Sequence, residues 1–272
     1  MGVAVVRFYT LPPRVIKYPF LFTTMLRWRE LLYRDFEHAI VDAGVEYFFL
    51  DRKLRDYPRH YLIEYERRAR LLGKLFGDRV WVVIPDYPDD LVPGLTYENG
   101  MDNVDKTLRN VERFIQVDGV EWLPVIQSRY ENTFSFLESC ERLRELIGDY
   151  PRVAIGTVCK ARKLAWITYC LSSARAFFPH SLIHAFGLTL AALGKLERGT
   201  INSFDSMAWS YGKMRLYDKV VGDSWRKMAV EIYEKLPATW PSSTRAQVSY
   251  FLAYLKRISE LTGEDIVSLA DW

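Results

Sequence analysis

With 272 residues, of which 49% are hydrophobic and 26% are charged, the chain has the composition of a folded globular protein and not of a disordered one. No stretch approaches the ~18 consecutive apolar residues of a membrane span, and the first residues lack the pattern of a secretion signal, so we expect neither. The net charge of +3 permits nucleic-acid binding without requiring it, because such binding depends on whether the positive charges cluster.

Strands and helices are predicted to alternate along most of the chain. The first strand, residues 3–9, is an apolar run that ends before Pro12 and Pro13. Further strands are predicted at 20–24, 45–50, 79–85, 120–126, 152–156, 181–186 and 200–204. Apolar residues at steps of three and four predict helices at 26–43, 61–76, 104–115, 136–147, 164–176 and 190–197. Gly44 is expected to end the helix at 26–43.

Eight strands that alternate with helices predict a (β/α)8 TIM barrel. An open, doubly wound sheet is the alternative, but the glycine-rich first turn of a Rossmann unit is absent. After Tyr211 the sequence is helical in pattern, with Val248, Leu252 and Leu255 on one face. We therefore expect a single domain over residues 1–272, with the barrel at about 1–235 and extra C-terminal helices at about 236–272.

Polar side chains follow four of the predicted strands. Asp51, Asp86, Gln127 and Asp205 each come at or directly after the end of an apolar run. In a barrel these ends meet at one mouth, where catalytic groups lie, so the three acids suggest acid/base or nucleophilic chemistry. Each Asp is equally suited to cap the helix that follows it. Three converging negative charges cost energy unless a ligand uses them, which favours a functional site.

The three cysteines and the scarce histidines argue against a metal site. Cys140, Cys159 and Cys170 are widely spaced and form no CxxC pair, so neither a zinc site nor a disulfide framework is expected. This cysteine usage predicts a reducing cytoplasm, which is that of the host cell if the chain is virus-encoded.

One group of acids is a candidate for a magnesium site. Asp86, Asp89 and Asp90 are close together in the sequence, as the ligands of such a site can be. Asp89 and Asp90 follow Pro88, however, and are more simply interpreted as solvated acids of a turn. We therefore expect no metal and no cofactor.

Six short motifs, in this order, resemble those of the tRNA-guanine transglycosylases and of their relatives that act on guanine in DNA. The resemblance covers about residues 45–212. The motifs are Phe49-Leu50-Asp51, Ile84-Pro85-Asp86, Val125-Ile126-Gln127, Ala154-Ile155-Gly156, His184-Ala185-Phe186-Gly187 and Ser203-Phe204-Asp205-Ser206. The resemblance implies a glycosyltransferase that exchanges guanine for a 7-deazaguanine base such as preQ0.

The resemblance also implies roles for the motif residues. Asp205 would attack the anomeric carbon of a guanosine and form a covalent glycosyl-enzyme, and Asp51 would serve as general acid and base. Asp86 and Gln127 would bind the purine edge, and the amide of Gly156 would contact its carbonyl group. His184 and Gly187 belong to the motif of the seventh strand and are also expected to help bind the base.

The chain departs from the family's pattern at several points. The family's Ser-Gly-Gly after the acid/base Asp is here Arg52-Lys53-Leu54, while Ser128 and Thr157 replace the glycines after Gln127 and Gly156. The family's Cys-x-Cys-x-x-Cys zinc site and its RNA-binding appendage are missing from the sequence. These absences favour the DNA-acting relatives, so DNA is the expected substrate and tRNA is the alternative.

Basic and aromatic residues near the predicted mouth suit a nucleic-acid substrate. Basic residues predicted to contact phosphates are Arg52, Lys53, Arg55, Lys160, Arg162, Lys163, Lys213 and Arg215. The alternative is that these charges are solvated and paired with acids on the helices. Aromatic candidates for a wall that receives an extruded base are Tyr87, Tyr130, Trp209 and Tyr211, each of which could equally serve in packing.

Two other functions fit the same residues. A base-excising N-glycosidase would use water in place of the incoming base, and a non-catalytic barrel would bind only nucleic acid or a partner protein. The presence of both Asp51 and Asp205 favours an enzyme. The sequence leaves open whether the chain forms a homodimer or needs a helper protein.

Overall fold

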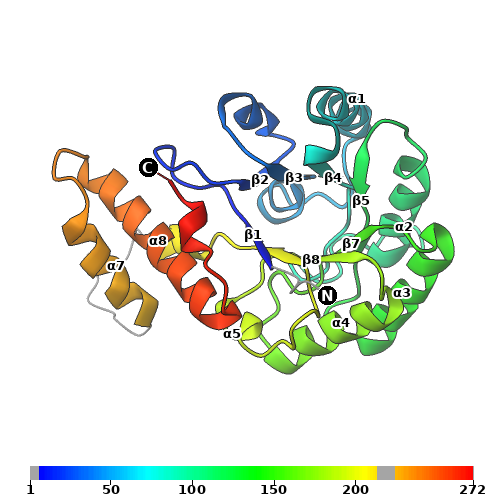
Figure 1. The fold of residues 1–272 in the computed structure, drawn as a ribbon. Helices are drawn as coiled ribbons and strands as arrows, with labels where there is room; N and C mark the ends of the chain where they lie inside the picture. The colour runs from blue at the N-terminus through cyan, green and yellow to red at the C-terminus, as the bar shows by residue number, and fades with distance from the viewer. Residues whose placement is uncertain (1–5, 213–223, 272) are drawn as a thin grey trace.

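The computed structural model describes residues 6–212 and 224–271, and within them it shows a mixed α/β protein with two parallel sheets (Figure 1). One sheet has the strand order β1-β9-β8-β7-β6, and the other has the order β2-β3-β4-β5. The strands are β1 (Arg7–Tyr9), β2 (Phe20–Thr24), β3 (His38–Asp42), β4 (Val80–Val83), β5 (Glu121–Leu123), β6 (Val125–Ile126), β7 (Arg152–Ile155), β8 (Leu182–Ala185) and β9 (Ser203–Asp205).

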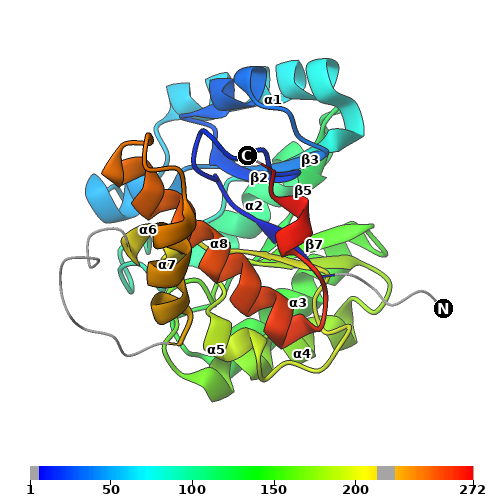
Figure 2. The same ribbon diagram turned by 60° about the vertical axis from the view of Figure 1, so that its left-hand side comes forward.

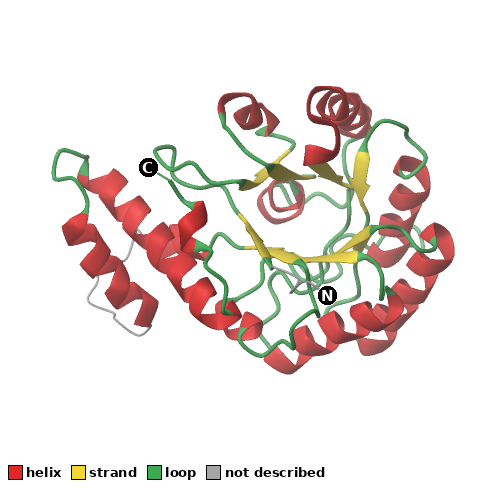
Figure 3. Cartoon of the chain, in the orientation of Figure 1, coloured by secondary structure: helices red, strands yellow, loops and turns green. Residues whose placement is uncertain are grey.

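Helices follow most of the strands. The α-helices are α1 (Arg59–Phe76), α2 (Asn103–Phe114), α3 (Thr133–Ile147), α4 (Leu164–Phe177), α5 (Leu190–Leu193), α6 (Ala208–Gly212), α7 (Ser224–Lys235) and α8 (Ser242–Thr262). The 3₁₀ and π helices of the described ranges are η1 (Trp28–Tyr33), η2 (Glu46–Asp51), η3 (Gly77–Arg79) and η5 (Val267–Leu269). Figures 2 and 3 show the strands inside, with α1 on the outer side of one sheet and α3 and α4 on the outer side of the other.

The two sheets are linked at both pairs of neighbouring edges. Just beyond β1, Thr10 forms a parallel bridge with Leu21 of β2. At the other side, Pro124 separates β5 from β6, and its carbonyl oxygen accepts a hydrogen bond of 2.8 Å from the amide of Ala154 in β7. Because proline has no N–H, Pro124 interrupts the ladder without breaking the path of the chain. One continuous segment, 121–126, therefore pairs with β4 through β5 and with β7 through β6.

Helix α1 shows how the apolar periodicity of the sequence places a helix on a sheet. Its buried stripe includes Tyr61 and Tyr65, whose hydroxyls donate to the carbonyl oxygens of Ala43 (2.6 Å) and Val83 (2.5 Å). These bonds satisfy the two hydroxyls inside an apolar contact, as buried polar groups require. They also tie α1 to the segments that follow β3 and end β4.

The long helix α8 covers the outer side of the sheet that contains β1. Tyr254 packs on Phe8 of β1 at a ring-centroid distance of 5.5 Å, and Phe251 packs on Tyr18 at 5.5 Å and on Trp209 at 5.2 Å. Helix α7 lies against α8 (Figure 2). The expectation of helices in the C-terminal part of the chain is confirmed by α7 and α8.

The region before α1 differs from the prediction. The predicted helix at 26–43 is wrong, because residues 38–42 form strand β3, which pairs with both β2 and β4. The predicted strand at 45–50 is also wrong, because residues 46–51 form a single π-helical turn. Gly44, at φ +83°, turns the chain from β3 into η2 and does not end a helix. The buried rings of Phe48 and Phe49 pack against Tyr57, which explains an apolar run that is not a strand.

The other predicted elements match the structure to within a few residues, with three exceptions in extent. The predicted strand at 120–126 is divided into β5 and β6, and the predicted helix at 190–197 is shortened to α5. The predicted strand at 200–204 begins only at Ser203. Of the predicted first strand, residues 7–9 are confirmed as β1 and residues 3–5 lie outside the described ranges.

Candidate active site

A cavity of about 640 Å³ lies at the carboxyl ends of the strands. Loops after β2, β3, β4, β6, β7, β8 and β9 contribute to its wall, so it collects residues that are far apart in the sequence. Four buried carboxyl groups line it, those of Asp42, Asp86, Asp90 and Asp205. Ligand sites of parallel α/β proteins lie at this end of the strands.

Asp205 is held in a fixed orientation at the end of β9. Its Oδ1 accepts a hydrogen bond of 3.0 Å from the amide of Gly187 and lies 3.3 Å from Nε2 of His184. The other ring nitrogen of His184, Nδ1, lies 2.9 Å from the hydroxyl of Ser203. A buried carboxylate oriented through one oxygen keeps the other for chemistry, which suits a nucleophile.

The structure places His184 and Gly187 against Asp205. The ring of His184 is fully buried and stacks on Phe22 at 6.3 Å. Gly187 has φ +59°, and a Cβ at this position would lie 2.5 Å from Sγ of Cys159. Only glycine fits this conformation and this space without displacement, so Gly187 is required for the amide that orients Asp205.

Asp86 and Gln127 form a buried pair on the cavity wall. Nε2 of Gln127 donates to Oδ2 of Asp86 at 2.5 Å. Gln127 is 1% exposed and Asp86 is 3% exposed. Among the described residues, neither Oδ1 of Asp86 nor Oε1 of Gln127 has a hydrogen-bond partner. Burial, with the negative charge of Asp42, raises the pKa of Asp86 to about 8, against the hydrogen bond from Gln127. When Asp86 is ionised, its Oδ1 and Oε1 of Gln127 are two unpaired acceptors in the cavity wall, which suit a ligand that presents several N–H donors.

The predicted role of the Gly156 amide is wrong, because this amide is already used. It donates to the carbonyl oxygen of Ile126 at 3.0 Å, as part of the contact between β6 and β7. The lack of a side chain at Gly156 instead leaves space for Gln127, because a Cβ on Gly156 would lie 2.1 Å from Nε2 of Gln127. The absence of a side chain at Gly156 therefore lets Gln127 lie over β7 and reach Asp86.

Asp42 is the site residue that the sequence analysis missed. Asp42 is the last residue of β3 and is 8% exposed. The sequence had instead suggested a strand at 45–50 that leads into Asp51. Oδ2 of Asp42 accepts a hydrogen bond of 2.6 Å from the amide of Gly44. Burial raises the pKa of Asp42 to about 6, and the charge of Asp205 contributes in the same direction. A carboxyl group with a pKa near neutrality beside a second carboxylate is suited to proton transfer.

The signal for Asp42 was present in the sequence. Ile40-Val41-Asp42 is an apolar run that ends in Asp, which is the pattern by which Asp86 and Asp205 were selected. Asp51 lies at the exposed end of η2 and still contributes to the mouth of the cavity. Asp42 was not recognised as the end of a strand because residues 26–43 were predicted to form a helix.

Asp89 and Asp90 are buried, so their interpretation as solvated acids is wrong. Asp89 accepts hydrogen bonds from the amide of Gly94 and the hydroxyl of Tyr97, which fix its own loop, and from the amide of Tyr130 in the loop after β6. Oδ2 of Asp90 accepts from the amide of Lys160 at 2.8 Å, while Oδ1 has no partner among the described residues. Burial raises the pKa of Asp90 to about 6. In the described ranges, no three His, Cys, Asp or Glu side chains form a group that could hold a metal ion.

The aromatic wall of the cavity consists of residues other than those expected. Tyr87 is fully buried and donates to Asp56, and Trp209 is buried with its Nε1 donating to Thr10 at 2.8 Å. Tyr130 is partly exposed and does not line the cavity, and the side chain of Tyr211 lies outside the described residues. The rings that do line it are those of Phe22, Tyr47 and Phe186.

The predicted phosphate-binding residues are exposed where the structure describes them, but several already have partners. Nζ of Lys160 lies 2.6 Å from Glu46, Lys163 pairs with Glu131, and Arg52 lies over the ring of Tyr47. Lys53, Arg55 and Arg162 are also exposed, whereas Lys213 and Arg215 lie outside the described residues. The structure places another arginine, Arg27, in the wall of the cavity.

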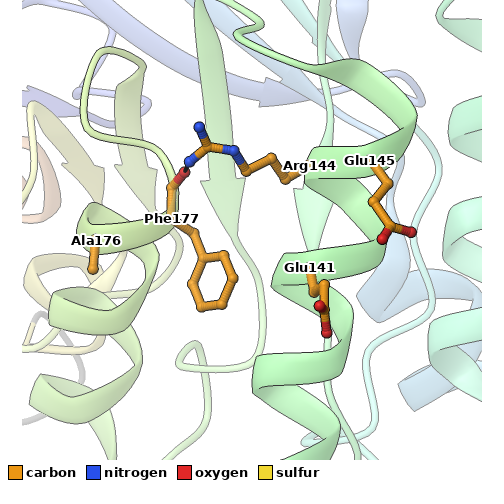
Figure 4. A pocket seen from close by; sticks show the side chains of 5 residues that line it. All are labelled: Glu141, Arg144, Glu145, Ala176 and Phe177. Atoms are coloured by element: carbon orange, nitrogen blue, oxygen red, sulfur yellow. Dashed lines mark hydrogen bonds between the residues drawn. The ribbon is translucent and has the colours of Figure 1, made fainter.

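A second hollow, of about 670 Å³, lies between the C-terminal halves of α3 and α4 (Figure 4). It is lined by Glu141, Arg144, Glu145, Ala176 and Phe177. Arg144 donates to the carbonyl oxygen of Phe177, so its guanidinium holds the two helices together. The hollow lies where α3 and α4 lead into β7 and β8, away from the strand ends that carry the buried acids.

The chain has no match among protein-family models or among curated protein sequences. No helix in the described ranges is long and apolar enough to cross a membrane. The geometry of the cavity is therefore what supports a functional assignment.

Proposed function

We propose that this protein is a base-exchange glycosyltransferase that replaces guanine in a nucleic acid, DNA in preference to tRNA, with a 7-deazaguanine base. The observation that carries the proposal is one cavity with two functional sides. On one side, Asp205 is oriented by Gly187 and His184. On the other, Asp86 and Gln127 keep two acceptor oxygens without partners among the described residues. The first arrangement suits attack on a sugar, and the second suits recognition of a purine edge.

We also propose that the two sheets form one closed (β/α)8 barrel. The bridge between Thr10 and Leu21 supports closure at one side, and the two pairings of segment 121–126 support it at the other. Counted with β5 and β6 as one strand, the ring contains eight parallel strands. Closure would bring Asp42 and Asp205 to the same mouth, in agreement with the effect of the Asp205 charge on Asp42.

The chemistry needs one nucleophile and one proton carrier. A carboxylate oxygen of Asp205 attacks the anomeric carbon, the bond from that carbon to the base breaks, and the bonding electrons leave with the guanine. Asp42 supplies the proton that neutralises the leaving base. The incoming 7-deazaguanine then returns a proton to Asp42 as its ring nitrogen displaces Asp205 from the sugar, so the protons balance over the cycle.

This proposal transfers the acid/base role from Asp51 to Asp42, and the two residues can be compared directly. We expect Asp42→Asn to slow exchange by about 10²- to 10⁴-fold, the range for removal of a positioned acid or base. Asp51→Asn, which changes an exposed residue at the mouth, should stay within a few fold of the unmodified protein. Single-turnover rates of base exchange measure both, and the opposite ranking would return the role to Asp51.

Recognition of guanine would use the acceptors on the cavity wall. The purine edge of guanine presents an N–H and an amino group side by side, which match Oδ1 of Asp86 and Oε1 of Gln127 as unpaired acceptors. Phe22, Tyr47 and Phe186 would supply rings for an extruded base to stack on. The four carboxyl groups favour a neutral or cationic ligand over an anionic one.

Release of labelled guanine tests the proposed function. Double-stranded DNA and unmodified tRNA, each with labelled guanine, are incubated with the protein in the presence and absence of preQ0. We expect release from DNA only when preQ0 is present, with the 7-deazaguanine recovered in the polymer.

The other outcomes separate the alternatives. Release from tRNA alone would reverse the preference for DNA, and release without preQ0 would show an N-glycosidase that uses water. Binding of nucleic acid without release from either substrate would show a non-catalytic protein and contradict the proposal.

A further inference from the structure

A groove opens beside the cavity that contains the buried acids. Its volume is about 300 Å³, and it lies between the loop after β1, the turn η1, the segment around α6 and the start of α8. Leu11, Arg27 and Met207 line both the groove and the cavity, so the two are continuous. A ligand that entered the cavity through its mouth would meet this groove at the rim.

The groove carries a net positive charge. Arg14, Arg27 and Arg34 line it together with one acid, Glu30. Nη2 of Arg27 lies 2.5 Å and Nε of Arg34 lies 3.5 Å from Glu30. Three guanidinium groups and one carboxylate leave two positive charges in the groove, and the charge of Arg14 is close enough to lower the pKa of Glu30.

The walls of the groove are fixed by the fold. Pro12 and Pro13 stiffen the loop that carries Arg14, and the amide of Ile16 donates to the carbonyl oxygen of Pro13 at 3.0 Å. The side chain of Arg34 is only 13% exposed, so its position is restricted. A groove that gathers three guanidinium groups suits an anion with several oxygens, such as a phosphate.

The charges of the cavity and of the groove have opposite signs. The cavity is lined by the buried acids Asp42, Asp86, Asp90 and Asp205, and those that are ionised repel a phosphate group. The adjoining groove has a net positive charge and attracts a phosphate group. A nucleotide would therefore be oriented at the rim, with its base in the acidic cavity and its phosphates in the basic groove.

We infer that the groove lined by Arg14, Arg27 and Arg34 binds the phosphodiester backbone of the nucleic-acid strand whose base enters the cavity. This inference rests on the proposed function, since it names the path of the polymer substrate at the same site. It assigns the backbone contacts to arginines of the loop after β1 and of η1, none of which was among the basic residues expected from the sequence.

Salt-dependent binding of a short, fluorescein-labelled single-stranded DNA with one guanine tests this inference. Arg14→Gln and the pair Arg14→Gln/Arg34→Gln remove charge but keep polar side chains, and Arg27 is left intact because it also lines the cavity. We expect the pair to weaken binding about tenfold at low salt. The slope of log K against log salt should fall by about 1.4, since each phosphate contact on a single strand contributes about 0.7. The single variant should lose about half of that slope.

A matched control removes the same charge elsewhere. Arg67→Gln/Arg70→Gln changes two exposed arginines on α1 that pair with Glu64 and Glu66, and it should leave the slope unchanged. Equal losses in both pairs, or no loss in the groove pair, would overturn the inference. Binding of free preQ0, followed by calorimetry, should be the same in all variants. Failure of the unmodified protein to bind preQ0 would instead contradict the proposed function.

Discussion

Replacement of Asp205 by Asn is expected to abolish base exchange, with a fall of at least about 10³-fold in the single-turnover rate. The amide side chain has no carboxylate to attack the sugar, so no glycosyl-enzyme can form. Its Oδ1 can still accept the hydrogen bond from Gly187, so the fold should be preserved. Nucleic-acid affinity should therefore stay within a few fold of that of the unmodified protein.

The covalent intermediate provides an independent readout of the same substitution. Denaturation in the presence of labelled DNA should trap a protein–DNA adduct with the unmodified protein and none with Asp205→Asn. Asp51→Asn is the matched control, because it keeps both the nucleophile and Asp42 and should still form the adduct. An adduct that persisted in Asp205→Asn would show that another residue attacks the sugar.

The second large effect concerns the dependence of stability on pH. Burial raises the pKa of Asp86 from 3.8 to about 8, so between these values the folded protein holds a proton that the unfolded chain has released. The free energy of unfolding must then fall as pH rises, by up to about 1.4 kcal/mol per pH unit from this group alone. Asn at this position does not titrate, so Asp86→Asn should become more stable relative to the unmodified protein from pH 5 to about 8.

Urea denaturation at a series of pH values measures this difference. Asp42 and Asp90 also make the free energy of unfolding fall as the pH rises to about 6. They do so in both proteins, so their contributions cancel in the comparison. Asp51→Asn, at the exposed end of η2, is a control that should run parallel to the unmodified protein. Parallel curves for Asp86→Asn would show that Asp86 is ionised in the folded protein over this range.

The same substitution should weaken binding of the base. Above about pH 8, where Asp86 is ionised in the folded protein, loss of this charged acceptor costs about 1.5–3 kcal/mol, which corresponds to about a 10- to 150-fold loss of preQ0 affinity in calorimetry. A variant that is more stable at alkaline pH and binds the base less well would show that Asp86 is retained at a cost to the fold. Undiminished affinity would remove Asp86 from base recognition.

Much of the fold follows from periodicity in the sequence. Apolar steps of three and four located α1 through Tyr61, Tyr65 and Ala69, and continuous apolar runs located β4 and β7. These patterns are reliable because each reports burial against a regular neighbour. The prediction failed between Leu26 and Leu50, where the apolar segment at 47–50 belongs to a π-helical turn and the strand lies before it, at His38–Asp42.

The same failure shifted one residue of the candidate site. Asp86, Gln127 and Asp205 were expected at the mouth because their strands were placed correctly, and all three line the cavity. Asp42 was missed because its strand was predicted as helix. The contacts of His184 with Asp205 depend on the register between β8 and β9, which periodicity within one strand does not specify.

The close packing of Gln127 over Gly156 means that the floor of the cavity does not tolerate substitution, in contrast to its rim. The floor is built on backbone, and even a methyl group at Gly156 would collide with Gln127. The rim, in contrast, is formed by the partly exposed apolar side chains of Leu26, Val45 and Met207, which lie outside the strands. Variation in substrate range among descendants of this protein would therefore arise at the rim, while the floor preserved the base edge that is read.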